Sequence, residues 1–178
     1  MTRVKLTEEG LATTLKNKFL LLDTGVIIRG FEHFEEFEIF FNFLKQADCG
    51  LVYFPFIEFE FVRGAYDPHL RERKQEFLHA LAMTKMPFRS ETTLMPDTIK
   101  IANAYTARKL NSPALTDCCI AAYLKNFSKN LLFVTVNHKY FPTFLFDRIF
   151  IYPIDTQKDI FPLGFYQYSE IKGKDIGL

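Results

Sequence analysis

The stretch Phe19-Leu-Leu-Leu-Asp-Thr-Gly25 decides the fold prediction. Its first four residues form a continuous apolar run without polar alternation, which is typical of a strand buried on both faces of a parallel sheet. Asp23 follows the run directly, and Thr24 and Gly25 then lead into the apolar residues 26–28. This order predicts a buried strand that ends at a carboxylate and passes through a turn into a helix.

The same alternation of short apolar runs and amphipathic segments continues along the chain. Further strands are expected at 50–54, 131–134 and 148–152, and helices at 31–44, 55–64, 67–85 and 115–127, with another helix opening at 95–97. Buried strands separated by helices predict an α/β fold, a three-layer sandwich with a central parallel sheet. We expect one domain over residues 1–178, with 172–178 as a loose C-terminal tail.

Composition excludes several classes of protein. Lys and Arg number 22 and Asp and Glu 21, so the net charge of +1 does not support a bulk electrostatic grip on nucleic acid. Three cysteines without C-x-x-C spacing fit neither a disulfide framework nor a zinc knuckle, and they favour a reducing cytoplasm. No run approaches the ~20 apolar residues of a membrane span, and the first ten residues lack an apolar signal segment. We therefore expect a cytoplasmic protein with no membrane contact.

Motif absences direct attention to the acidic residues. The chain contains no G-x-G-x-x-G, no P-loop and no G-x-S-x-G, and its four histidines lack the spacing of metal ligands. Asp23 lies at a strand end, where function and helix capping are equally good explanations. Glu60 and Glu58 point about 200° apart on a helix and cannot face one site. Asp117 opens a segment rich in small residues that allow a helix to approach the sheet closely.

Four segments, taken in order, resemble one family. Leu20–Ile28, Glu60–Gly64, Asp117–Ala122 and Leu132–Phe141 are similar to the sequence motifs of PIN domain nucleases, the fold of the VapC-like toxins. The resemblance spans about residues 19–153. It implies a PIN-like fold and a metal-dependent ribonuclease that hydrolyses RNA phosphodiester bonds, as the toxin of a toxin-antitoxin pair.

Asp23, Glu60 and Asp117 match three of the family's acids. The resemblance implies that they hold Mg²⁺ or Mn²⁺, and hard cations of this kind prefer carboxylate oxygens. Thr135 and Asn137 are then expected to orient the attacking water or a phosphate oxygen. Basic residues in nearby segments are expected to hold the RNA backbone; these are Arg29, Arg63, His138 and Lys139, with Arg108 and Lys109 as further members of the group.

One position departs from the family pattern. Tyr140 stands where the family motif has an acid, and Asn137 stands where some members carry one. The departure leaves a second hypothesis open, a catalytically weakened PIN-like module that binds RNA or protein. A phosphotransferase with Asp23 as nucleophile ranks lower, because the second Asp of the dehalogenase motif is absent. Besides RNA, an antitoxin protein and a second copy of the chain are the expected partners.

Overall fold

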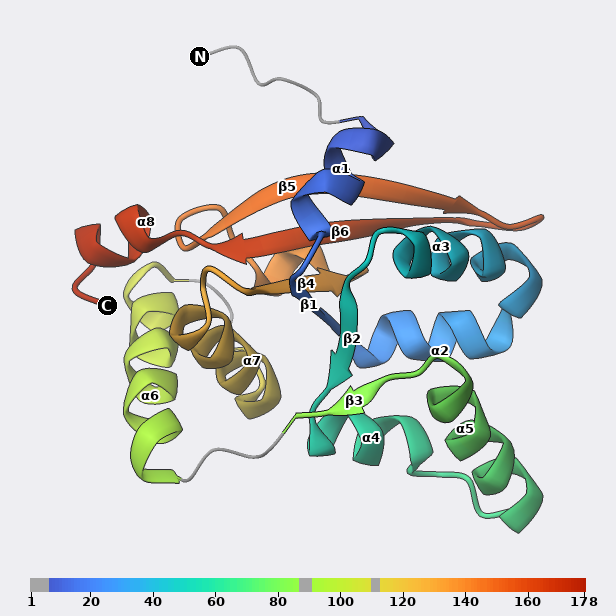
Figure 1. Ribbon diagram of the computed structural model, residues 1–178. Coiled ribbons are helices and arrows are strands. Elements are labelled where there is room, and N and C mark those ends of the chain that lie inside the picture. Colours follow the sequence, from blue (N-terminus) through green and yellow to red (C-terminus); the bar gives the residue numbers. More distant parts are fainter. Residues whose placement is uncertain (1–6, 87–90, 110–112) are drawn as a thin grey trace.

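The computed structural model describes residues 7–86, 91–109 and 113–178, apart from the side chains of residues 91–93. Figure 1 shows the elements in space. In chain order they are α1 (Glu8–Leu15), β1 (Phe19–Leu22), α2 (Thr24–Glu32), α3 (Phe34–Gln46), β2 (Gly50–Tyr53), α4 (Pro55–Val62), α5 (Pro68–Ala80), β3 (Thr84–Lys85), α6 (Glu91–Ala107), α7 (Leu115–Asn126), β4 (Leu131–Thr135), the 3₁₀ turn η1 (His138–Tyr140), β5 (Phe146–Asp155), β6 (Ile160–Tyr168) and α8 (Glu170–Asp175).

The strands form one mixed sheet in the order β3-β2-β1-β4-β6-β5. The first four of these are mutually parallel, whereas β6 pairs antiparallel with both β4 and β5. The α/β class and a parallel centre of the sheet are therefore confirmed, whereas β6 and β5 at one edge add antiparallel pairs that were not predicted. A short hairpin joins β5 to β6, and chain reversal in so few residues requires antiparallel pairing.

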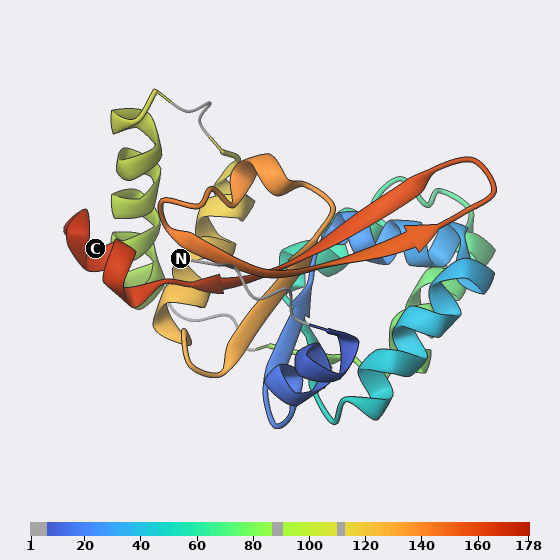
Figure 2. The ribbon, with the colours of Figure 1, turned by 90° about the horizontal axis from the view of Figure 1, so that it is seen from above.

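Helices cover both faces of the sheet. Figure 2 shows α6 and α7 on one side, with α2 and α3 on the other. The predicted apolar face of α3 lies against the core, because Phe37, Phe40 and Leu44 are fully buried. Strands β1 and β4 supply the centre of the core, and every residue of β4 is buried. This arrangement is compatible with three α/β layers.

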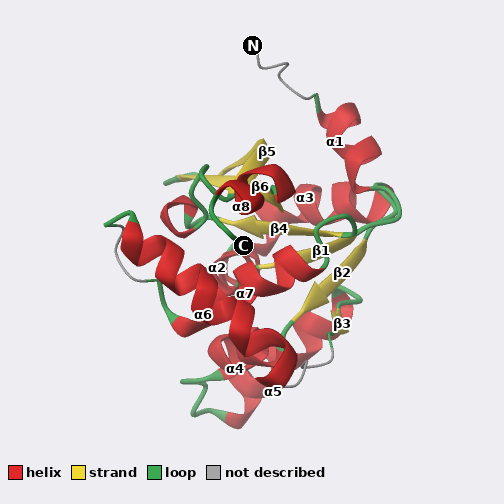
Figure 3. Ribbon diagram, turned by 90° about the vertical axis from the view of Figure 1, so that its left-hand side faces the viewer, coloured by secondary structure: helices red, strands yellow, loops and turns green. Residues whose placement is uncertain are grey.

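The carboxyl ends of β1 and β4 meet, because the two strands are parallel neighbours with Leu22 opposite Val134. Helix α2 begins directly after β1, and α4 contacts α2 beside it. Figure 3 shows α7 lying across the sheet near this edge. The loop after β1, the loop after β4 and the helices α4 and α7 therefore surround one end of the sheet.

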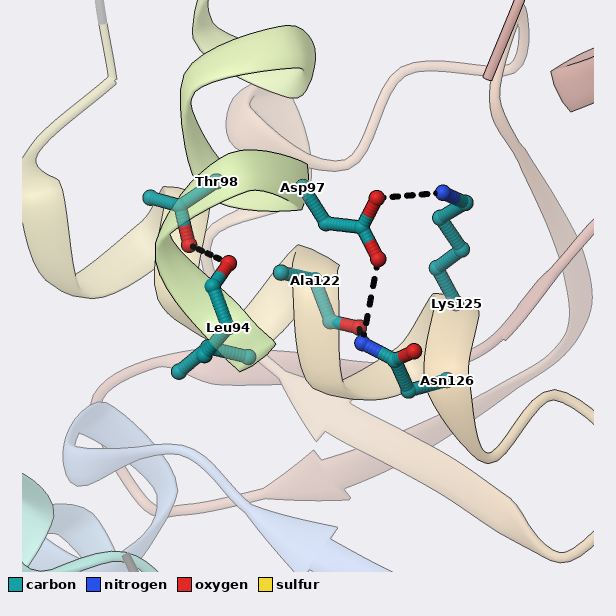
Figure 4. A network of polar contacts seen from close by, with 6 residues as sticks. All are labelled: Leu94, Asp97, Thr98, Ala122, Lys125 and Asn126. Atoms are coloured by element: carbon teal, nitrogen blue, oxygen red, sulfur yellow. Dashed lines mark hydrogen bonds and ion pairs between the residues drawn. The ribbon is translucent and has the colours of Figure 1, made fainter. Parts of the chain in front are cut away.

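Helices α6 and α7 are joined by a polar network, shown in Figure 4. Asp97 of α6 pairs with the Lys125 ammonium at 2.6 Å and accepts a hydrogen bond from the Asn126 amide at 3.2 Å. The Asp97 and Lys125 side chains are only 17% and 20% exposed. The network fixes the outer helix of this layer to the inner one.

Several predicted boundaries are wrong. The helix expected over 67–85 ends at Ala80, because Ala82 takes a left-handed φ of 51° and residues 84–85 join the sheet as β3. Helix α6 begins at Glu91 and not at 95–97, so that Pro96 lies inside it. The expected tail, 172–178, begins within α8, where Lys172 pairs with Asp147 at 2.5 Å. In the described ranges, no helix is long and apolar enough to cross a membrane.

Candidate functional site

Asp23 lies at the carboxyl end of β1, in the N-cap position of α2. Its side chain makes no capping hydrogen bond with the helix, so capping does not account for this carboxylate. Instead the Thr135 hydroxyl, at the end of β4, donates to Asp23 Oδ2 at 2.5 Å. The pKa of Asp23 is raised to about 6: burial is the largest cause, the hydrogen bonds from Thr135 and the Thr24 backbone lower it, and the negative charges of Asp117 and Glu60 raise it.

Glu60 reaches the same region from helix α4. The Thr24 hydroxyl at the start of α2 donates to Glu60 Oε2 at 2.6 Å, and the Thr116 hydroxyl of α7 donates to Glu60 Oε1 at 3.4 Å. One carboxylate is thereby held between helices that begin 91 residues apart in the chain. Glu58 pairs with Lys85 on another side of α4, at 2.6 Å, as the angular separation of the two glutamates predicts.

Asp117 lies in the first turn of α7. The backbone N–H of Ala114 donates to Asp117 Oδ2 at 3.2 Å, which is one half of a capping box. Burial raises the pKa of Asp117, and the charge of Glu60 raises it further, whereas the Ala114 hydrogen bond and the Lys139 ammonium lower it. Asp117 thus has a capping role, and it also lies within electrostatic reach of the other two acids.

The three predicted acids come together at one end of the sheet. The negative charges of Asp117 and Glu60 both act on the Asp23 carboxyl, and the charge of Glu60 acts on the Asp117 carboxyl. Among the described residues, no Lys, Arg or His forms an ion pair with any of the three. The positive charge of Lys139 acts on Asp117 and lowers its pKa. Three partly buried carboxylates held this close are a site of negative potential that favours a cation.

The donor chemistry of this site fits a hard divalent ion. Within the described part of the chain, no three Asp, Glu, His or Cys side chains stand close enough to ligate one ion directly. Mg²⁺ does not require such a group, because it retains several waters and binds through one or two carboxylates together with substrate phosphate. Asp23, Glu60 and Asp117 are the carboxylates at this end of the sheet that could hold such an ion, directly or through waters.

The loop after β4 completes the site. The Thr135 hydroxyl that donates to Asp23 also accepts the backbone N–H of Asn137 at 2.8 Å, so one hydroxyl fixes both the acid and the loop. Gly25 allows the start of α2 to approach this loop, since a Cβ at position 25 would lie 3.0 Å from the Val136 side chain. The Asp-Thr-Gly sequence is therefore explained by the packing of two strand ends.

The four predicted RNA contacts occupy different environments. Arg29 lies about 9 Å along α2 from Asp23, with its guanidinium 4.7 Å from the centre of the Phe161 ring. Arg63 is exposed at the end of α4, one turn beyond Glu60. Lys139 is exposed and acts electrostatically on Asp117. Of the further pair, Arg108 lies 4.3 Å from the centre of the Phe144 ring, and Lys109 lies in the turn after α6 with a φ of 55°.

His138 is held by β6. Its Nδ1 lies 2.7 Å from the Tyr166 hydroxyl and its Nε2 lies 3.0 Å from the Pro162 carbonyl oxygen. Gly164 makes room for the ring, since a Cβ there would be 2.7 Å from two imidazole atoms. With both ring nitrogens partnered, His138 anchors η1 to β6.

Tyr140, at the position of the family's fourth acid, belongs to η1. Its backbone carbonyl accepts a hydrogen bond from the buried Tyr105 hydroxyl of α6, and its ring lies 4.6 Å from the Lys139 ammonium. Burial raises the pKa of Tyr105, and the nearby charge of Asp117 raises it further. Tyr105 therefore remains a neutral donor that fixes the η1 loop close to Asp117.

Sequence reasoning missed the hydroxyls that position Glu60. Thr24 follows Asp23 in the sequence, and Thr116 precedes Asp117. Both hydroxyls nevertheless donate hydrogen bonds to Glu60. Thr24 is buried at the first position of α2, although threonine side chains are mostly exposed in proteins. Its adjacency to Asp23 was the only signal in the sequence.

Comparison with known proteins gave no match among family models, curated proteins or solved structures.

Proposed function

We propose that the chain is a metal-dependent ribonuclease that hydrolyses RNA phosphodiester bonds at the end of β1 and β4. The observation that carries this proposal is the convergence of Asp23, Glu60 and Asp117, which come from three elements. The charges of Asp117 and Glu60 raise the pKa of Asp23, the charge of Glu60 raises the pKa of Asp117, and no Lys, Arg or His of the described residues forms an ion pair with any of the three. Keeping such a group together costs free energy, and a bound cation offsets that cost.

Each residue of the site has a separate role in the proposed reaction. Asp23 and the two other acids supply the negative oxygens for Mg²⁺ or Mn²⁺, which would stabilise charge on the phosphodiester and lower the pKa of the attacking water. Thr135 holds Asp23 in place and Thr24 holds Glu60. Lys139 is placed to offset the negative charge of an incoming phosphate, and Asn137 borders the same loop.

Cleavage of a labelled RNA by the purified chain tests the proposal. Activity should require Mg²⁺ or Mn²⁺, disappear with a chelator, and fall by about two orders of magnitude or more in Asp23→Asn, which keeps the side-chain shape. Asp155→Asn, an exposed acid of β5, is the matched control. Chelator-resistant cleavage would contradict the mechanism.

A non-catalytic module that binds RNA or protein is the second candidate. It is favoured by Tyr140, whose neutral phenol replaces the family's acid on the η1 loop. Metal-loaded protein that binds RNA and leaves it intact would support this candidate over the ribonuclease. An antitoxin partner, as in VapC-like pairs, is compatible with either candidate.

A further inference from the structure

We propose that the hollow between α4 and α5 is a nucleotide subsite, in which an unpaired RNA base stacks on Tyr66 and Phe59 while Arg63 binds the adjoining phosphate. This inference rests on the proposed function and extends it to a surface outside the carboxylate site. The hollow has a volume of about 360 Å³. That volume is at the small end of the ~300–1,000 Å³ typical of small-ligand sites, so it suits a single base and not a duplex.

The aromatic side chains of the hollow are unusually exposed. Tyr66 is 93% exposed and Phe59 is 64% exposed, although most aromatic rings of this chain lie in the core. Gly64, with φ of 81°, turns the chain after α4, and Ala65 is buried beneath the turn. The turn therefore presents Tyr66 outward on a fixed backbone. Proteins that bind single-stranded nucleic acid use exposed aromatic rings of this kind as platforms on which bases stack.

The charge around the hollow suits a phosphate. Arg63 and Arg71 line it, and within the described ranges neither pairs with a carboxylate. Arg71 donates to the Ala65 carbonyl at 3.4 Å, which directs it toward the turn. Glu58, the acid in the lining, is paired with Lys85. The hollow is left with uncompensated guanidinium groups, which bind phosphate through several N–H donors.

The hollow and the carboxylate site share helix α4. Phe59 and Glu60 are consecutive on α4, so their side chains diverge by about 100°, one toward solvent and the other toward Thr24. Arg63 lies one helical turn beyond Glu60. The hollow is lined by Glu58 and Phe59 and not by Glu60, so it lies on another side of α4 from the carboxylates. The same rings and guanidinium groups suit a protein contact surface, but two guanidinium groups without a carboxylate partner among the described residues favour a polyanion such as RNA.

Binding measurements on unpaired and duplex RNA test the subsite. The full chain carrying Asp23→Asn, in Mg²⁺, should leave the RNA intact, and fluorescence anisotropy of a short labelled RNA then reports affinity. Adding Tyr66→Ala should weaken binding of the unpaired RNA about tenfold, because one base loses its stacking partner, and should leave binding of the duplex unchanged. Tyr66→Trp should retain the affinity. Since Tyr66 is almost wholly exposed, these variants should fold as the parent does.

The phosphate contact has its own control. Arg63→Ala should weaken binding and reduce the slope of log affinity against log salt by about one, whereas Lys158→Ala, an exposed cation in the β5–β6 turn, should change neither. If Tyr66→Ala and Arg63→Ala bind unpaired RNA as tightly as their parent, the subsite is overturned and the ribonuclease proposal stands. This is also the result expected of a protein contact surface. If the parent binds no RNA and the wild type cleaves none, both proposals fail.

Discussion

At the scale of single residues, Asp23 is a carboxylate whose charged form the folded chain disfavours. Its carboxylate is buried among two other acids, so its pKa rises from an ordinary value of 3.8 to about 6. Between these values the folded chain binds a proton that the unfolded chain has released. The free energy of unfolding of the metal-free protein should therefore fall as the pH rises from about 4 to about 6.

Asp23→Asn should consequently stabilise the metal-free chain at neutral pH. A shift of about two pKa units corresponds to roughly 3 kcal/mol, and loss of the Thr135 contact reduces the expected gain to about 1–3 kcal/mol. Urea unfolding in chelator at pH 7 and pH 4 measures it, and the gain should shrink at the lower pH. Asp155→Asn should show no gain. A destabilised Asp23→Asn at neutral pH would mean that the charged carboxylate supports the fold.

Removing the Thr24 hydroxyl should show whether cleavage depends on the positioning of Glu60, apart from any effect on folding. Thr24→Val keeps the shape of the side chain and removes the hydroxyl that holds Glu60 at 2.6 Å. Metal-dependent cleavage should fall about 10–100-fold, as it does when partners of metal-ligating groups are removed. Thr116→Val, whose bond to Glu60 is 3.4 Å long, should have the smaller effect. Equal activity of Thr24→Val and wild type would show that Glu60 needs no positioning.

At the scale of elements, the polar network of Figure 4 should contribute to stability more than the exposed ion pairs do. Asp97→Ala leaves Lys125 without its partner in a half-buried position, and we expect a loss of about 1–3 kcal/mol in the free energy of unfolding. Asp147→Ala breaks the pair with Lys172, in which the aspartate is 52% exposed, and should cost less than about 1 kcal/mol. Urea titrations of both variants check the ranking, which equal losses would contradict.

The contact between η1 and β6 requires a residue without a side chain at position 164. Gly164→Ala would place a methyl group 2.7 Å from the His138 ring and from the Tyr166 ring, so we expect destabilisation by about 1–3 kcal/mol. The double variant with His138→Ala should recover part of the loss, since the imidazole is then absent. Thermal unfolding of the two variants measures this coupling, and purely additive losses would mean that the two residues do not clash.

Sequence patterns identified some elements better than others, for physical reasons. The strand Phe19–Leu22 could be recognised because every residue is apolar, and all but Phe19 are buried. The predicted face of α3 is confirmed because its apolar residues recur at helical spacing and are buried. The pair Thr84–Lys85 is exposed and has no apolar signal, so its place beside β2 depends on tertiary pairing. Strand β6, interrupted by Pro162 and Gly164, lacks a strand pattern of its own and is stabilised by β4 and β5.

At the scale of the whole molecule, the topology explains why the proximity of Asp23 and Thr135 could be predicted and the partners of Glu60 could not. Parallel β1 and β4 end at the same edge, so Asp23 and Thr135 must lie close together once the strands are recognised. Glu60 and Asp117 come from helices, and their inward direction depends on how α4 and α7 pack. The same packing decides which groups the Thr24 and Thr116 hydroxyls contact and how far the Tyr66 ring is exposed. The sequence has no hydrophobic periodicity that would reveal these positions.

The central claim concerns the three acids as one cation site, and calorimetric titration of Mn²⁺ into the purified chain tests it most directly. We expect a saturable binding event in wild type and in Asp155→Asn that is weakened at least about tenfold in Asp23→Asn and in Glu60→Gln. Near pH 6 the ion should displace protons from Asp23, so the heat should depend on the ionisation enthalpy of the buffer. Mn²⁺ binding of equal affinity in wild type, Asp23→Asn and Glu60→Gln would contradict the account.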